Sequence, residues 1–228
     1  MTDSALPPRL TRLLVTAGLF AACMAPAAPA ATVAPARAAR GTTASPRHAR
    51  APRLTPDTPV TRGSGYLALG DSVTFGYQEP SVVPPPDYGR ASRMIGYPAL
   101  VGAALHLKVT NLACPGETSA SLINADAPSL GCENGYRRLY PLHVRYRGAQ
   151  LAAAVAYLKA HRGVRLVSLM IGANDGFLCQ IHTSDGCVSE FAATRAAISR
   201  HVHRIVSTIR HQAGYTGQLV ILHYYSLN

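Results

Sequence analysis

The sequence lacks the patterns that mark three common classes of protein. It has no C-x-x-C pair, and no histidine stands beside its cysteines at zinc-site spacing, which argues against metal binding. Beyond residue 62 there is no dense Lys/Arg run with interleaved aromatic residues, so nucleic-acid binding has little support despite the net charge of +11. The apolar run near the N-terminus is too short to span a membrane. We expect no metal, no cofactor, no nucleic-acid partner and no stable membrane span.

The composition fits one globular domain with an N-terminal appendage. The chain has 228 residues, of which 48% are hydrophobic and 14% charged, and this argues against a wholly disordered protein. Residues 1–62 contain eight Arg and two Asp for a net charge of +6, and the remaining residues carry +5. The positive charge is therefore diffuse.

The N-terminus resembles an export signal. Arg9 and Arg12 precede the apolar run "LLVTAGLFAACMA", and Ala28-Pro29-Ala30 offers a cleavage site. An alternative is that Cys23 is the lipid-anchored cysteine of a lipoprotein. Residues 31–62 are rich in Ala, Pro and Arg with few large apolar side chains, which is typical of a disordered linker. We predict a signal peptide at 1–30, a linker at 31–62, a domain at 63–228, and a secreted protein.

Four cysteines remain beyond Cys23, and an even number in an exported chain suggests two disulfides. Three connectivities are possible from sequence alone. Pairing of sequence neighbours closes two short loops, and we predict Cys114–Cys132 and Cys179–Cys187.

Strand-like and helix-like segments alternate along the domain. Short apolar strands are predicted at 66–69, 108–114, 164–172 and 218–226, and helices at 97–107, 149–161 and 189–214. This β-α-β-α-β-α-β order predicts an α/β fold with a parallel sheet covered by helices on both faces. In such sheets the chemistry sits at the carboxyl ends of the strands.

Three of the predicted strands are followed by small and polar residues. The first ends in Gly70-Asp71-Ser72, the second is followed by Gly116 in "NLACPGETS", and the third is followed by Asn174-Asp175. Each cluster alone has an ordinary explanation, because Ser72 could be a helix N-cap and the others turn residues. Together they supply a nucleophile and hydrogen-bond donors for an oxyanion, as acyl transfer requires.

These blocks resemble the SGNH (GDSL) hydrolase family of esterases, lipases and acyl hydrolases. The first block reads "LALGDSVTFGYQ", the second is centred on Gly116, and the third reads "IGAND". The resemblance implies that Ser72 is the nucleophile and that Ser72, Gly116 and Asn174 form the oxyanion hole, supported by Gly70, Asp71 and Asp175. It also implies a flavodoxin-like three-layer α/β/α sandwich with a parallel sheet.

The sequence departs from the family in its last block. The family's Asp-x-x-His, which supplies the base and its orienting aspartate, does not occur in this sequence. We therefore expect the domain to be incomplete at its C-terminus. His182, between Cys179 and Cys187, is the only alternative base that we consider, whereas His201 and His203 are expected to face solvent on a helix and His223 to lie in a buried strand.

The predicted function is that of a secreted serine esterase or lipase, acting through an acyl-enzyme on Ser72. The alternative is a catalytically impaired protein of the same fold that binds acyl or glycan ligands. The expected partner is a small-molecule, lipid or acylated-carbohydrate ester, and the protein is expected to be a monomer. The segments at 83–98 and 131–148 are the expected pocket walls, and their Tyr and Arg content hints at an anionic group near the mouth.

Overall fold

A computed structural model describes residues 59–224, and the predicted signal peptide and linker lie outside these residues. The strands are β1 (Gly65–Gly70), β2 (Lys108–Asn111), β3 (Val164–Met170) and β4 (Gln218–Ile221). The main helices are α2 (Tyr97–Leu105), α5 (Gln150–Ala160), α6 (Ala173–His182) and α7 (Phe191–His211). Shorter helices are α1 (Ser72–Phe75), η1 (Ala91–Arg93), α3 (Ser119–Ile123), η2 (Cys132–Tyr136) and α4 (Arg137–Leu139).

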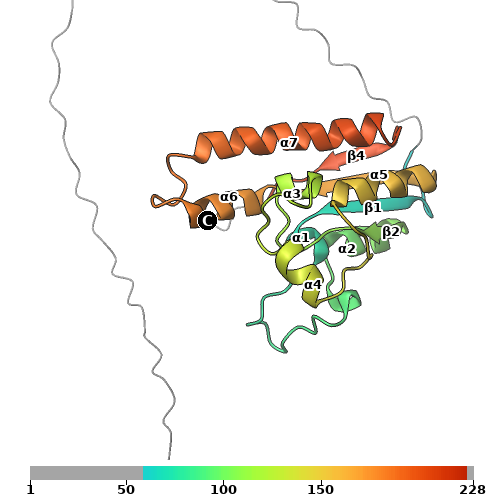
Figure 1. The fold of residues 1–228 in the computed structure, drawn as a ribbon. Helices are drawn as coiled ribbons and strands as arrows, with labels where there is room; N and C mark the ends of the chain where they lie inside the picture. Colours follow the sequence, from blue (N-terminus) through green and yellow to red (C-terminus); the bar gives the residue numbers. More distant parts are fainter. Residues whose placement is uncertain (1–58, 225–228) are drawn as a thin grey trace, which may run out of the picture. The chain divides into compact units, whose positions relative to one another are not determined.

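The four strands form one parallel sheet in the order β2-β1-β3-β4 (Figure 1). β1 and β3 occupy the centre and are almost completely buried, which explains their continuous apolar sequences. β4 lies at an edge and is mostly exposed. His223 follows β4 and is exposed, so the prediction that it belongs to a buried strand is wrong.

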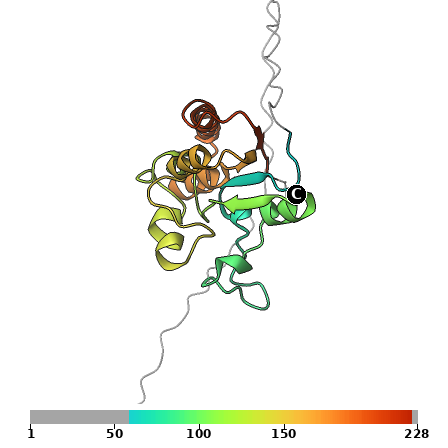
Figure 2. The same ribbon diagram turned by 90° about the vertical axis from the view of Figure 1, so that its right-hand side faces the viewer.

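Helices cover both faces of the sheet, as Figure 2 shows from the side. Because side chains alternate along a strand, Leu67 and Leu69 pack on one face with α5 and α7, and Tyr66 and Ala68 pack on the other. Val101 of α2 contacts this second face. The structure therefore confirms the predicted α/β architecture with a parallel sheet and flanking helices.

The sequence predicted the order of the long elements but missed α6. The sequence offers a turn as the ordinary explanation for Asn174-Asp175 and places His182 between Cys179 and Cys187, and no helix is predicted over either segment. Both segments belong to a ten-residue helix that begins directly after β3. The helical pattern is weak because only Asn174 of this helix is fully buried.

Both predicted disulfides are present. Cys114 is bonded to Cys132, and Cys179 is bonded to Cys187. The first joins the segment after β2 to η2, and the second joins the end of α6 to the turn before α7. No helix within residues 59–224 has the length and apolarity needed to cross a membrane.

Candidate functional site

The three polar clusters meet at one edge of the sheet. β1 lies between β2 and β3, and all three strands run parallel. The helices that follow them, α1, α3 and α6, gather at the carboxyl edge of these strands (Figure 1). The sheet order therefore brings residues 70–72, 116–119 and 174–175 to a common edge, as the strand-end rule predicts.

Ser72 is the first residue of α1, and its side chain is half-buried. The helix is capped by Asp71, whose Oδ1 accepts a hydrogen bond of 3.1 Å from the Val73 N–H. The Ser72 hydroxyl is therefore not the N-cap, which removes the ordinary explanation for a serine here. Within residues 59–224, neither the hydroxyl nor the N–H of Ser72 forms a hydrogen bond.

Gly70, two residues before Ser72, adopts a backbone conformation that other residues avoid. Its φ is 146°, and a Cβ at this position would lie 2.2 Å from the carbonyl oxygen of Met170. Glycine is required because the chain must pass close to the end of β3 before it turns into α1.

Gln150, the first residue of α5, joins the first block to the second. Its Oε1 accepts from the Gly70 N–H at 2.7 Å, and its Nε2 donates to the Gly70 carbonyl at 3.0 Å. The same Nε2 donates to Oε2 of Glu117 at 3.0 Å. Gln150 and Glu117 are completely buried, so these bonds form in a dry interior where unpaired polar groups are costly.

Gly116 also requires glycine. Its φ is 82°, and a Cβ would lie 2.3 Å from the carbonyl oxygen of Leu130. The Leu130 N–H donates to the Gly116 carbonyl at 2.8 Å, whereas the Gly116 N–H has no acceptor among the described residues. A free backbone donor in a glycine turn fits the oxyanion-hole role predicted for this residue.

Asn174 is buried in the first turn of α6. Its Nδ2 donates to the backbone carbonyl of Glu117 at 2.8 Å, which ties the third block to the second. An amide nitrogen carries two hydrogens, so one donor of Asn174 remains after this bond is made.

Comparison with known proteins agrees with these three blocks. Residues 68–224 match the model of the GDSL-like lipase/acylhydrolase family. The chain belongs to this family. No curated protein matches the chain.

Two solved structures of Streptomyces enzymes are similar to this GDSL-family chain. One is phospholipase A1 from Streptomyces albidoflavus NA297, with 23% identity, 73% of this chain and 63% of that chain covered, and a TM-score of 0.42. The other is an extracellular lipase from Streptomyces rimosus, with 22% identity, the same coverage of 73% and 63%, and a TM-score of 0.44. This chain thus spans less than two thirds of the length of either enzyme.

Burial raises the pKa of two carboxyl groups of the GDSL-family site. The pKa of Asp71 rises to about 6, mainly because the carboxyl is desolvated, although hydrogen bonds from Tyr224 and the Val73 N–H oppose the rise. The pKa of Glu117 rises to about 7, again mainly through desolvation, opposed by Ser121 and Gln150. Both carboxyls therefore favour the protonated form more than an exposed carboxyl does.

Asp175 enters a hydrogen-bonded chain that the sequence did not reveal. Its Oδ2 accepts from the Ser119 N–H at 2.8 Å, and its Oδ1 accepts from the Ser119 hydroxyl at 2.5 Å. The Ser119 Oγ also lies 2.8 Å from Nδ1 of His201 on α7. The prediction that His201 faces solvent is therefore wrong, whereas His203 is exposed. The helical spacing could have indicated that His201 faces inwards, because His201 stands between Ile198 and Ile205 on the apolar side of the helix.

His182 and His143 form their hydrogen bonds with backbone carbonyls rather than with Ser72. His182 ends α6, and its Nδ1–H donates to the Leu178 carbonyl of its own helix at 2.8 Å. Since α6 begins at the sheet edge, its last residue lies about 13 Å further along the helix axis. Nε2 of His143 lies 2.9 Å from the Phe75 carbonyl at the end of α1. Within residues 59–224, no histidine hydrogen-bonds to the Ser72 hydroxyl.

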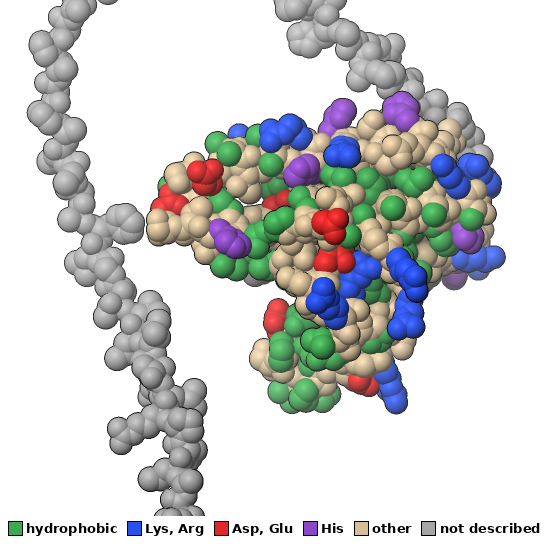
Figure 3. Space-filling model, in the orientation of Figure 1, with side chains coloured by type: hydrophobic (Ala, Val, Ile, Leu, Met, Phe, Trp, Pro, Cys, Tyr) green, Lys and Arg blue, Asp and Glu red, His purple; other side chains and the backbone are tan. Residues whose placement is uncertain are grey.

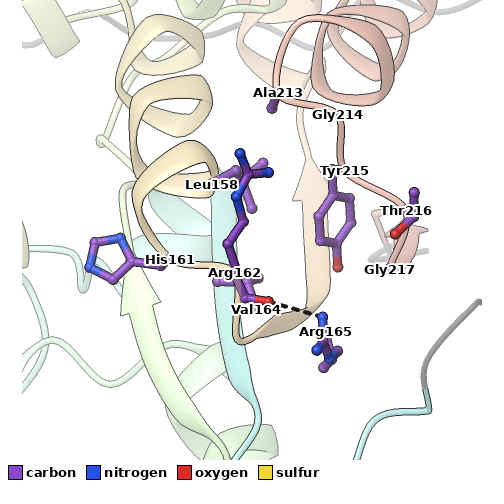
Figure 4. A pocket seen from close by; sticks show the side chains of 10 residues that line it. All are labelled: Leu158, His161, Arg162, Val164, Arg165, Ala213, Gly214, Tyr215, Thr216 and Gly217. Atoms are coloured by element: carbon purple, nitrogen blue, oxygen red, sulfur yellow. Dashed lines mark hydrogen bonds between the residues drawn. The ribbon is translucent and has the colours of Figure 1, made fainter.

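Two other features of the described chain are a pocket far from Ser72 and a cluster of possible metal ligands. A pocket of about 280 Å³ lies at the amino ends of β3 and β4, opposite the edge that carries Ser72, and contains Arg162, Arg165 and Tyr215 (Figure 4). Cys114, Glu117 and Cys132 lie close enough to form a metal-ligand set in the described chain. The two sulfurs are joined in a disulfide, so neither is available as a thiolate.

Proposed function

We propose that this GDSL-family chain hydrolyses carboxylic esters through an acyl-enzyme on Ser72. The observation that carries the proposal is the set of free polar groups at the carboxyl edge of the sheet. The hydroxyl and N–H of Ser72 and the N–H of Gly116 have no partner within residues 59–224, and Asn174 retains one amide hydrogen. An acyl-transfer site needs such a nucleophile beside several donors.

In the proposed reaction, Oγ of Ser72 attacks the ester carbonyl carbon while its proton passes to a base. The developing oxyanion accepts hydrogen bonds from the N–H groups of Ser72 and Gly116 and from Nδ2 of Asn174. Collapse of the tetrahedral intermediate expels the alcohol, and water then hydrolyses the acyl-serine. Each such donor contributes about 10²–10³ in kcat in well-studied hydrolases.

The donors of the proposed oxyanion hole are held by buried contacts. The carbonyl of Glu117 orients the Asn174 amide, and Gln150 joins the Glu117 carboxyl to Gly70. This arrangement supports catalysis because donors that are fixed before the reaction need no reorganisation when charge develops.

One observation favours a second candidate function. No histidine of residues 59–224 hydrogen-bonds to the Ser72 hydroxyl, and the sequence has no Asp-x-x-His. Loss of one triad member leaves only about 10³–10⁴-fold acceleration over water. A protein with this site and without an effective base would bind an acyl or glycan ligand and turn it over slowly.

We also propose that the protein acts outside the cell on a lipid, acylated-carbohydrate or small aryl ester. The two disulfides of the described domain suit an oxidising compartment. The export signal predicted at residues 1–30, or lipid anchoring through Cys23 as the alternative, would bring the chain there.

The deciding experiment compares hydrolysis of p-nitrophenyl acetate by the chain and by Ser72→Ala. Ser81→Ala, at an exposed position in the following loop, is the matched control. We expect Ser72→Ala to abolish turnover and to prevent formation of an acetyl-enzyme detectable by mass spectrometry, and Ser81→Ala to retain both. Equal turnover by the chain and Ser72→Ala would reject catalysis by Ser72, and ligand binding without turnover would support the second candidate.

A further inference from the structure

A second cavity, called the arginine cavity below because arginine is its most frequent lining residue, lies beside α4. Its volume is about 880 Å³, and it is bounded by η2, α4 and the segment at 139–148. Four arginines line it, Arg137, Arg138, Arg145 and Arg147, against one acidic residue, Glu133. Figure 3, drawn in the orientation of Figure 1, shows basic side chains gathered on the face over α4. The volume is within the range of small-molecule pockets, roughly 300–1,000 Å³.

The acidic residue of this arginine cavity is already neutralised. Glu133 forms an ion pair of 2.7 Å with Nη1 of Arg137, and both side chains are largely buried. Arg138 donates only its Nε–H, to the Glu133 carbonyl at 3.1 Å. Arg145 and Arg147 form no ion pair or side-chain hydrogen bond within residues 59–224. Three guanidinium groups of the arginine cavity therefore lack an anionic partner.

The unpaired arginines are carried by a segment whose backbone is fixed. Nη2 of Arg137 donates to the Tyr146 carbonyl at 2.7 Å, and Nη1 donates to the Gly148 carbonyl at 3.1 Å. The Arg137 guanidinium also lies 4.5 Å from the centre of the Tyr146 ring. Tyr146 points inwards, and its neighbours Arg145 and Arg147 are exposed. The two charges are thus anchored at their backbone, which lowers the entropy lost when a ligand orders them.

One part of the cavity wall is apolar. Leu139, Tyr140 and Pro141 line it beside the arginines, and Leu139 is 73% exposed. An exposed leucine next to guanidinium groups suits a ligand that carries both an anionic group and an organic portion.

We propose that the arginine cavity binds the phosphate group of an organic phosphate ester. Three guanidinium groups without partners match a phosphate better than a single carboxylate, because phosphate offers more oxygens and up to two negative charges. Guanidinium forks bind these oxygens in pairs, which a lysine ammonium cannot do. The site is distinct from Ser72 and does not depend on ester hydrolysis. The phosphate could belong to a lipid headgroup or to a soluble ester.

The test measures binding to the full chain without any turnover step. Isothermal titration with glycerol 3-phosphate and with inorganic phosphate examines the soluble source. Co-sedimentation with vesicles of phosphatidylglycerol, compared with vesicles of phosphatidylcholine, examines the lipid source. Each is measured at low and high salt, because exposed charge interactions are screened by salt.

The key variant is R145Q/R147Q, and its matched control is R195Q/R200Q. The control removes the same charge from two exposed arginines of α7 that form no hydrogen bonds within residues 59–224. We expect R145Q/R147Q to weaken binding about tenfold or more, which corresponds to 1.4 kcal/mol or more. The control R195Q/R200Q is expected to change the binding affinity by less than about twofold. Circular dichroism checks that both variants fold.

Dependence of glycerol 3-phosphate binding on Arg145 and Arg147 would support the proposal with a soluble ligand. The same dependence seen only with phosphatidylglycerol vesicles would support it with a lipid ligand. Equal effects of the two arginine pairs, or no binding of any phosphate probe by the chain, would overturn it. If R145Q/R147Q does not fold, R145K/R147K replaces it, and unchanged affinity of that variant would contradict recognition by guanidinium forks.

Discussion

Gln150 hydrogen-bonds to both backbone groups of Gly70, which stands 80 positions earlier in the chain, at 2.7 and 3.0 Å. A single side chain at the start of α5 therefore satisfies the peptide groups where β1 ends, two residues before Ser72. Glu117 accepts a further hydrogen bond from the same amide. The nucleophile turn and the Gly116 loop are consequently connected through one buried side chain.

Replacing Gln150 with alanine should destabilise the domain and misplace the Ser72 turn. The change leaves the buried Gly70 N–H and Oε2 of Glu117 without a partner, so we expect a loss of about 2–4 kcal/mol in the free energy of unfolding. Ester hydrolysis should fall on the order of 10²-fold through kcat, because small displacements of reacting groups are costly. Chemical denaturation and p-nitrophenyl acetate kinetics measure both effects.

Gln180→Ala is the matched control, because Gln180 is exposed in the last turn of α6. We expect its unfolding free energy to stay within about 0.5 kcal/mol of the original. If the unfolding free energy of Gln150→Ala were also within this range, the hydrogen bonds of Gln150 would contribute little to stability.

Glu117→Gln should change how stability depends on pH. Folding raises the pKa of Glu117 from 4.5 to about 7, so the folded state binds its proton more tightly than the unfolded state. The associated stability is complete below the unfolded pKa and is lost as pH rises through about 7. The glutamine does not titrate, and its oxygen can still accept from Gln150 while its amide faces the Ser121 hydroxyl.

We therefore expect the unfolding free energy of the original chain to fall relative to Glu117→Gln by about 3 kcal/mol between about pH 4 and about pH 8. Urea denaturation over this pH range provides the measurement. Glu79→Gln, at an exposed loop position, should follow the original chain at every pH. Parallel curves for the chain and Glu117→Gln would contradict the raised pKa of Glu117.

Ser119→Ala should break the chain of hydrogen bonds from Asp175 to His201. The serine hydroxyl is buried and bonds to both partners, at 2.5 and 2.8 Å. Its removal leaves two polar groups short of a partner, and we expect a loss of about 1–3 kcal/mol in stability. Thermal unfolding measures the effect.

A paired comparison on α7 separates this hydrogen-bonded chain from general effects on the helix. His201→Ala should lower the melting temperature, whereas His203→Ala should leave it nearly unchanged, because His203 is exposed and forms no hydrogen bond within residues 59–224. Equal effects of the two substitutions would indicate that the contact of His201 with Ser119 adds no stability.

Gly116→Ala should distort the loop that carries a proposed oxyanion donor. Its φ of 82° is unfavourable for alanine, and the added Cβ would meet the Leu130 carbonyl at 2.3 Å. We expect a loss of about 1–3 kcal/mol in stability and of about 10²–10³ in kcat. Gly163→Ala is the control, since nothing lies within 4 Å of its Cβ position, and hydrolysis by Gly163→Ala should match that of the original chain.

The sequence alone was sufficient for the four strands, three of the four long helices, both disulfides and the three polar clusters. Apolar strands such as 164–170 are recognisable because a strand buried on both faces is apolar at every position. The pairing of Cys114 with Cys132 followed from the short loops that neighbour pairing closes. Ser72, Gly116 and Asn174 could be selected because parallel strands end at one edge of the sheet.

Tertiary structure decided which side chains support those clusters. Nothing in the local sequence indicates that Gln150 contacts Gly70 or that His201 contacts Ser119, because these contacts join segments 80 and 82 positions apart. They depend on how α5 and α7 pack on the sheet. The sequence determined that a serine follows β1, and the residue at which α1 begins determined that Asp71 caps the helix and that the Ser72 hydroxyl stays free.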